Sequence, residues 1–154
     1  MQTRTTSSFS LIVTAGARHC ALPLESVLET MRVLKAERIP GAPAFVLGVS
    51  IIRGEAVPVV DLAALLGEPA SAQTTRLVLL RIDDHRVALV VDTVLDVHEH
   101  DPDALLGMPS LAGEITSGAA VAIERLDDRF LLVLDTAKLI STDTLEILGR
   151  LDVP

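Results

Sequence analysis

The segment from His98 to Asp103, HEHDPD, gathers the residue types most capable of chemistry in this chain. In an extended conformation His98 and His100 would lie on the same side of the backbone, where two imidazoles and a nearby carboxylate could bind zinc or nickel. No third ligand follows at a spacing that known metal sites use. We therefore expect a solvated polar loop with no metal ligands, and the alternative is a metal- or ligand-binding β-barrel protein that uses this cluster.

Two pairs of acidic residues and one cysteine could also take part in catalysis. Asp83-Asp84 and Asp127-Asp128 could act as general acids and bases, yet each pair lies between two strand patterns near an arginine, so turn formation explains them. Nothing in the sequence marks a base for Cys20, which we expect to be a small buried hydrophobe. There is no glycine-rich phosphate loop either. We expect a protein that is not an enzyme and that has no cofactor.

The composition narrows the classes of partner. The chain has 154 residues, of which 49% are hydrophobic and only 2% aromatic, with no Trp or Tyr, so its core must be aliphatic and it lacks aromatic platforms for stacking bases. A net charge of −8 argues against nucleic acid or an anionic membrane as a partner. The single cysteine fits a reducing compartment, and no apolar run has the length of a membrane span. We therefore expect a cytoplasmic protein.

The stretch from Arg38 to Gly67 predicts a β-hairpin at the centre of the fold. A strand beginning at Gly48 and a second strand ending at Asp61 are separated by a tight turn. Glycine at the first central position suits a type II′ turn, so we expect Gly54-Glu55 to be the two-residue loop. Arg53 would then stand at the tip of the hairpin, where it can pair with a carboxylate or contact a partner.

The remaining patterns predict a mainly β chain with few helices. We expect one or two helical turns within Leu24 to Met31 that run into a strand at 32–38, and a short helix capped by Asp61. Residues 101–117 are typical of a loop, and Asp143 with Glu146 predicts the start of a C-terminal helix. The other expected strands are 9–15, 20–23, 76–82, 87–93, 94–98, 119–126 and 130–134.

Two stretches of the chain repeat. The sequence from Ala21 to Glu29 aligns with that from Ala88 to Asp96 at an offset of 67, and the sequence from Val59 to Leu66 aligns with that from Val133 to Ile140 at an offset of 74. A loop insertion in the second copy would account for the difference. The order of the two matches predicts a tandem duplication of a small β unit, and closed barrels are one way for such units to avoid exposed sheet edges.

The stretch VLETMRVLKAERIPGAPAFVLGVSIIRGEAVPVVDL resembles the signature region of CheW-like chemotaxis coupling proteins, and the similarity extends from Phe9 to Ile140. The resemblance implies two interlocked five-stranded SH3-like or OB-like barrels. It implies one domain at 9–141, with halves at about 9–67 and 76–141 that exchange strands, followed by a C-terminal helix at 142–154. Members of this family have no catalysis of their own. They couple the cytoplasmic tip of a chemoreceptor to the regulatory domain of the CheA histidine kinase.

The resemblance also implies a partner-binding surface. It assigns Glu29 and Arg53 to a salt-bridged pair beside a groove for the receptor, and apolar side chains of the same region would form the groove walls. The expected partner-binding residues are Val27, Glu29, Ile39, Gly48, Val49, Ile51, Arg53 and Gly54.

Two departures from the family pattern bear on the identity of the partners. Ile51-Ile52 replaces the usual Asn-Leu before the arginine, and Ala63 stands where a basic residue is common. An auxiliary adaptor of a non-flagellar chemosensory or twitching-motility pathway is therefore a further alternative.

Overall fold

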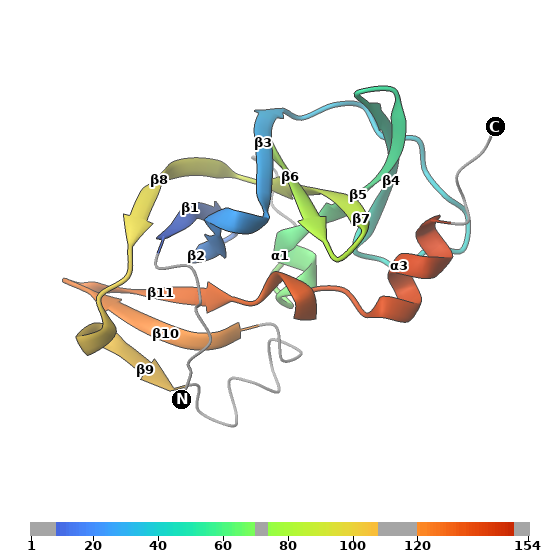
Figure 1. Cartoon of the computed structure of the whole chain (residues 1–154). Coiled ribbons are helices and arrows are strands. Elements are labelled where there is room, and N and C mark those ends of the chain that lie inside the picture. The colour runs from blue at the N-terminus through green and yellow to red at the C-terminus, as the bar shows by residue number, and fades with distance from the viewer. Residues whose placement is uncertain (1–8, 70–73, 108–119, 150–154) are drawn as a thin grey trace.

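The computed structural model describes residues 9–69, 74–107 and 120–149, and it is built mainly of β-strands in two mixed sheets (Figure 1). The strands of the first half are β1 (Phe9–Ala15), β2 (Arg18–Pro23), β3 (Val27–Arg32), β4 (Val46–Ile52) and β5 (Glu55–Asp61). Those of the second half are β6 (Arg76–Ile82), β7 (His85–Val91), β8 (Thr93–Glu99), β9 (Leu105–Gly107), β10 (Ala120–Leu126) and β11 (Arg129–Leu134). The α-helices are α1 (Leu62–Leu65) and α3 (Thr142–Gly149), and single 3₁₀ turns occupy Leu24–Ser26, Pro102–Ala104 and Thr136–Lys138.

Each sheet takes strands from both halves of the chain. The six-stranded sheet has the order β8-β1-β2-β11-β10-β9, and the five-stranded sheet has the order β3-β6-β7-β5-β4. In Figure 1 the six-stranded sheet lies to the left and the five-stranded sheet to the upper right, with α1 between them. Neither sheet is therefore built from one half of the chain alone.

The internal repeat seen in the sequence is visible in the pairing of the strands. In the five-stranded sheet β5 runs parallel to β7, with Val59 opposite Ala88. In the six-stranded sheet β11 runs parallel to β2, with Val133 opposite Ala21. Val133 is the repeat partner of Val59, and Ala21 is that of Ala88, so both parallel pairs have the same register. Each pair joins one copy of the repeat to the other.

The expectation of five strands in each unit is wrong for one sheet. Residues 105–107 form β9, which pairs with β10, although that part of the chain was expected to be a loop. Three residues are too few to show the alternation that marks a strand in a sequence. In the five-stranded sheet the corresponding contact is a single antiparallel bridge between Glu37 and Val49, and both of its N–H···O distances are 2.8 Å.

Two other local expectations are also corrected. The stretch from Leu24 to Met31 forms only one 3₁₀ turn before β3 begins at Val27, and the strand expected at 32–38 is reduced to the end of β3 and the Glu37 bridge. The loop of the central hairpin is Arg53-Gly54, because both residues have positive φ, 54° and 80°. Positive φ at both central residues defines a type I′ turn rather than type II′.

The core between and within the sheets is aliphatic, as the composition requires. Its largest cluster joins residues of both sheets, and Leu22, Leu62, Leu80, Leu89 and Leu134 are among its fully buried members. The side chain of Asp61 caps α1 by accepting a hydrogen bond from Ala63 N at 3.1 Å, as the sequence predicts. The cap of α3 is Ser141, whose Oγ accepts from Thr144 N at 3.1 Å, rather than Asp143. Among the described residues, no helix is long and apolar enough to cross a membrane.

Candidate functional site

Arg53 and Glu29 form a bidentate ion pair on the surface of the five-stranded sheet. Arg53 Nη2 lies 2.7 Å from Glu29 Oε1, and Arg53 Nε lies 3.0 Å from Oε2. The hydrogen bonds to Arg53 lower the pKa of the Glu29 carboxyl below its usual range, and the same bonds raise the pKa of the guanidinium. The arginine side chain is 68% exposed and the glutamate 31% exposed, so a partner can reach both groups.

The position of this pair follows from the topology. Glu29 lies on β3 and Arg53 lies in the turn after β4, and these strands are the two opposite edges of the five-stranded sheet. The ion pair therefore connects the two edges, and the Glu37–Val49 bridge joins the segment after β3 to β4. A planar guanidinium that binds both carboxylate oxygens fixes the relative orientation of its partners as well as their distance.

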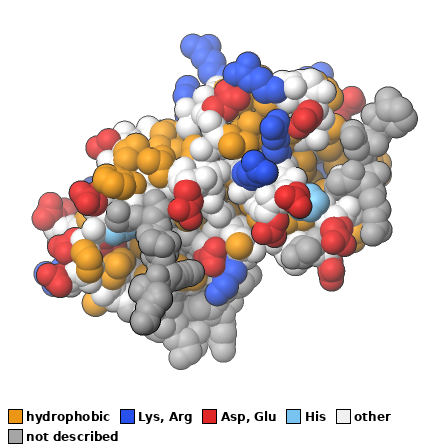
Figure 2. Space-filling model, viewed as in Figure 1, with side chains coloured by type: hydrophobic (Ala, Val, Ile, Leu, Met, Phe, Trp, Pro, Cys, Tyr) orange, Lys and Arg blue, Asp and Glu red, His pale blue; other side chains and the backbone are white. Residues whose placement is uncertain are grey.

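Three of the four apolar residues expected in the groove lie together. Ile39, Val49 and Ile51 line a depression of about 730 Å³ together with Lys35, Glu37, Arg38, Pro40, Ser50 and Ala56. Ile51 is 68% exposed, which is unusual for a large aliphatic side chain. Most of the Lys and Arg side chains visible in Figure 2 lie over the upper part of the molecule, which carries the five-stranded sheet. The depression is thus lined by both apolar and charged side chains.

The other expected partner-binding residues have different surroundings. Val27 is half-buried and packs against the main core rather than lining the depression. Gly48 is buried against residue 37, so closely that a Cβ at this position would lie 2.1 Å from the carbonyl oxygen of Glu37. Gly54 faces open space and serves the turn that presents Arg53. These residues therefore shape the surface without contributing side chains to it.

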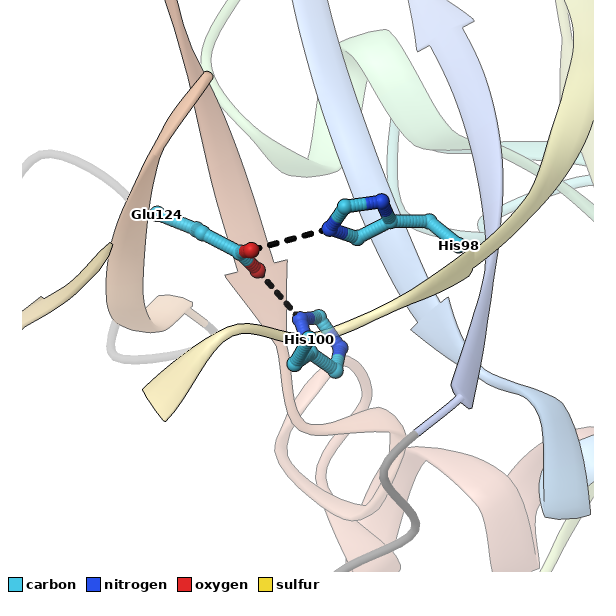
Figure 3. A group of neighbouring side chains, drawn as sticks. All are labelled: His98, His100 and Glu124. Atoms are coloured by element: carbon cyan, nitrogen blue, oxygen red, sulfur yellow. Dashed lines mark hydrogen bonds and ion pairs between the residues drawn. The ribbon is translucent and has the colours of Figure 1, made fainter. Parts of the chain in front are cut away.

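A second polar cluster lies at the six-stranded sheet, and we did not predict from the sequence that Glu124 belongs to it. Glu124 on β10 has a fully buried side chain, and its Oε2 accepts hydrogen bonds from His98 Nε2 at 2.8 Å and from Asp101 N at 3.1 Å (Figure 3). Its Oε1 bonds to His100 Nδ1, and Ser10 Oγ lies 2.7 Å from His100 Nε2. The expectation that 98–103 is a solvated loop is therefore wrong for both histidines.

Burial opposes ionisation of the Glu124 carboxyl, but the hydrogen bonds from His100, His98 and the backbone of Asp101 outweigh it, so its pKa lies below the usual range. The three residues His98, His100 and Glu124 are also a possible metal-ligand set, since one donor atom from each lies within 4.8 Å of the others. Glu124 could have been recognised in the sequence as a charged residue in the middle of an apolar strand pattern.

The groups weighed for catalysis have structural roles. Asp83 and Asp127 are the first residues of two hairpin turns and both have positive φ, which confirms turn formation. Burial raises the pKa of the Cys20 thiol to about 12, as expected for a buried small hydrophobe rather than a nucleophile.

Comparisons with known proteins agree with this picture. The CheW-like domain family matches residues 10–144. The probable chemotaxis protein CheW of Rhizobium etli is 29% identical over 128 residues, which cover 82% of this chain and 83% of the relative. Protein FrzA of Myxococcus xanthus is 35% identical over 101 residues, or 64% of this chain and 62% of the relative.

A solved structure shows the same fold. The scaffolding protein TtCheW from Thermoanaerobacter tengcongensis superposes with a TM-score of 0.78 at 21% identity, covering 90% of this chain and 95% of that chain. The chain belongs to the CheW-like domain family. This membership confirms the resemblance found in the sequence and, with it, the expectation of a non-enzymatic protein of the chemotaxis scaffolding class.

Proposed function

We propose that this protein is a cytoplasmic adaptor that couples the cytoplasmic tip of a chemoreceptor to the regulatory domain of a CheA-type histidine kinase. Family membership supports the class of function. The observation that carries the site is the exposed Glu29–Arg53 pair, which stands on the same sheet as the apolar depression around Ile51.

The depression suits a helical partner. A receptor tip is a helical hairpin, and an amphipathic helix docks by burying apolar anchors in a groove while its polar flanks meet charged margins. Ile39, Val49 and Ile51 supply the apolar floor, and Lys35 and Arg38 supply positive charge at the margin. The bidentate ion pair holds the sheet edges in place, so a partner would meet a preformed surface and lose little free energy to ordering it.

The finer fold belongs to the same proposal. We infer that each sheet closes into a barrel and that the two barrels interlock within one domain at 9–141, with halves at 9–67 and 76–141 and a helix that follows from 142. The Glu29–Arg53 and Glu37–Val49 contacts close the first barrel. The cluster around Glu124 ties β8 to β10 in the second. Two closed units leave few free sheet edges for unspecific association.

The test is charge reversal with purified partners. Binding of the receptor tip and of the CheA regulatory domain would be measured separately for Glu29→Arg, Arg53→Glu and the doubly reversed variant. We expect each single reversal to weaken binding of at least one partner by about 10-fold or more, because it places a like charge against the remaining member of the pair. The double variant restores the ion pair and should recover part of the loss.

A second ion pair provides the matched control. Arg18 Nε lies 2.8 Å from Glu68 Oε2, and the arginine of this pair is also exposed. Neither residue belongs to the depression around Ile51. Reversal of Arg18 should leave both affinities unchanged. If Arg53→Glu and Arg18→Glu behave alike, the pair on the five-stranded sheet has no specific part in coupling.

A further inference from the structure

The cluster of His98, His100 and Glu124 contains more polar side chains than are needed to hold a neighbouring segment against a strand. In the first copy of the repeat the equivalent of Glu124 is Ser50 on β4, which is also buried. β4 contacts the segment around Glu37. Ser50 fulfils its role with one hydrogen bond to the carbonyl of Lys35, at 2.7 Å. The second copy uses a carboxylate and two imidazoles at the same place, although a hydroxyl group suffices in the first.

The three side chains also converge from separate elements. His98 comes from β8, His100 from the segment that follows it, and Glu124 from β10, and all point toward one another in Figure 3. The side chain of Glu124 is fully buried, that of His100 is 11% exposed and that of His98 is 26% exposed. The cluster therefore has a closed inner side and one side, at His98, through which a small ion could enter.

We infer that His98, His100 and Glu124 form a binding site for one divalent transition-metal ion such as Zn²⁺. Two histidines and one glutamate are a donor set that zinc accepts, with a fourth position left for water. Imidazole ligands favour zinc, cobalt, nickel or copper over Mg²⁺ and Ca²⁺, which prefer oxygen donors. This inference concerns the six-stranded sheet and does not depend on the proposed adaptor function.

The geometry needs only a small adjustment to accept the ion. Ligand bonds of about 2.0–2.2 Å in a tetrahedral site place neighbouring donor atoms roughly 3.3–3.6 Å apart. His98 Nε2 and Glu124 Oε2 are hydrogen-bonded at 2.8 Å, and one donor atom from each of the three residues lies within 4.8 Å of the others. Small side-chain shifts would therefore bring the donor atoms to the separations that a metal site requires.

The hydrogen bonds around the cluster are compatible with a bound ion as well as with protons on the histidine nitrogens that face Glu124. For His100 Nδ1 to bind a metal, its Nε2 must carry the proton, and Ser10 Oγ lies 2.7 Å away as an acceptor for it. The serine hydroxyl can also donate when the metal is absent, because a hydroxyl group serves either role. Glu124 would bind the ion through Oε1, in place of its hydrogen bond to His100 Nδ1, while Oε2 keeps the hydrogen bond from Asp101 N at 3.1 Å. For His98 to bind the ion through Nε2, its ring proton must lie on Nδ1.

Bound zinc would link the two ends of the six-stranded sheet. β8 is one edge of this sheet, and β10 neighbours β9 at the other. An ion held between His98 and Glu124 would stabilise the folded chain in proportion to its occupancy, since the unfolded chain does not hold the three ligands together.

The experiment titrates the tag-free, full-length protein with ZnCl₂ by calorimetry after removal of bound ions with EDTA and dialysis. We expect one equivalent of Zn²⁺ to bind and the melting temperature to rise with it. His98→Ala, His100→Ala and Glu124→Gln should each weaken binding by about 100-fold or more. Ser10→Ala should weaken it by about 10-fold, because it removes the hydrogen-bond partner of His100 Nε2. CoCl₂ would report the donor set by its absorption spectrum, whereas MgCl₂ and CaCl₂ should not bind.

The chain supplies its own controls. It has four histidines, and the other two are His19 and His85, so His19→Ala and His85→Ala should retain the zinc affinity of the unmodified protein. Circular dichroism in EDTA checks that each variant is folded, and Glu124→Gln keeps the shape of the side chain. The inference is overturned if no zinc binds, in which case the cluster is a proton-linked network only. It is equally overturned if binding survives Glu124→Gln or is lost in His19→Ala or His85→Ala.

Discussion

Ser50 and Glu124 occupy equivalent positions in the two sheets, 74 residues apart. Both are buried polar residues that form a hydrogen bond to the backbone of a segment in the same half of the chain. The direction of the hydrogen bond is opposite in the two cases. Ser50 donates to the carbonyl of Lys35, whereas Glu124 accepts from the N–H of Asp101. The two repeated positions therefore have the same place in the fold and different chemistry.

Gly48→Ala should strongly destabilise the protein. A Cβ there would lie 2.1 Å from the oxygen and 2.6 Å from the carbon of the Glu37 carbonyl, at a φ of +151° that alanine rarely adopts. The substitution must push residue 37 away from β4 and break the bridge between Glu37 and Val49. We expect a loss of about 3 kcal/mol or more in the free energy of unfolding, measured by urea denaturation.

Gly41→Ala separates the two causes. Gly41 also has a positive φ, +81°, but no atom lies within 4 Å of its Cβ position. This variant should therefore show only the backbone cost, about 1–2 kcal/mol. Equal losses in both variants would mean that the close approach of residue 37 to β4 does not matter for stability.

The hairpins could be predicted because they depend on neighbouring residues. The turn at Arg53-Gly54 was placed one residue too late, since the sequence gives no sign that Arg53 itself takes a positive φ. The contact of Glu124 with His98 joins residues 26 apart on different strands, and side chains that meet in this way leave no periodic signal. Family resemblance implied the Glu29–Arg53 pair, and the structure contains it.

The aspartates that start the two short helices should contribute to stability in parallel. Asp61 accepts from Ala63 N at 3.1 Å, and its repeat partner Asp135 accepts from Ala137 N at 3.0 Å. Asp61→Ala and Asp135→Ala should each lower the free energy of unfolding by about 0.5–2 kcal/mol, with the larger loss at the buried Asp61. Urea denaturation measures both. Asp128→Ala, in an exposed turn, should change it by less than about 0.5 kcal/mol, and a comparable loss there would argue against capping.

Ile51→Glu should weaken partner binding without weakening the fold. The side chain is 68% exposed, so its replacement removes little buried apolar area, but it would place a charge on the floor of the proposed groove. We expect the affinity for the receptor tip to fall by about 10-fold or more while the melting temperature stays nearly constant. Titration with the purified tip measures the first and calorimetry the second.

Ile147→Glu is the matched control for that change. Ile147 lies on α3 and is 55% exposed, yet it does not line the depression. Its substitution adds the same charge to the protein and should leave binding unchanged. A similar loss of affinity in both variants would show that net charge, rather than the groove, determines the interaction.

The stability of the protein should decline more steeply above pH 9 than that of its Cys20→Ala variant. Burial, the largest cause, raises the pKa of the thiol from 9.0 to about 12, so the folded state keeps its proton at pH values where the unfolded state loses it. The stability that this raised pKa contributes is fully present below pH 9 and is lost as the pH rises toward 12, by at most about 1.4 kcal/mol per pH unit. Urea denaturation at several pH values between 8 and 11 measures the loss. The chain has no Tyr, which removes one group that would otherwise titrate in this range. Cys20→Ala should show a shallower decline above pH 9, and parallel curves for the two proteins would contradict a buried, protonated thiol.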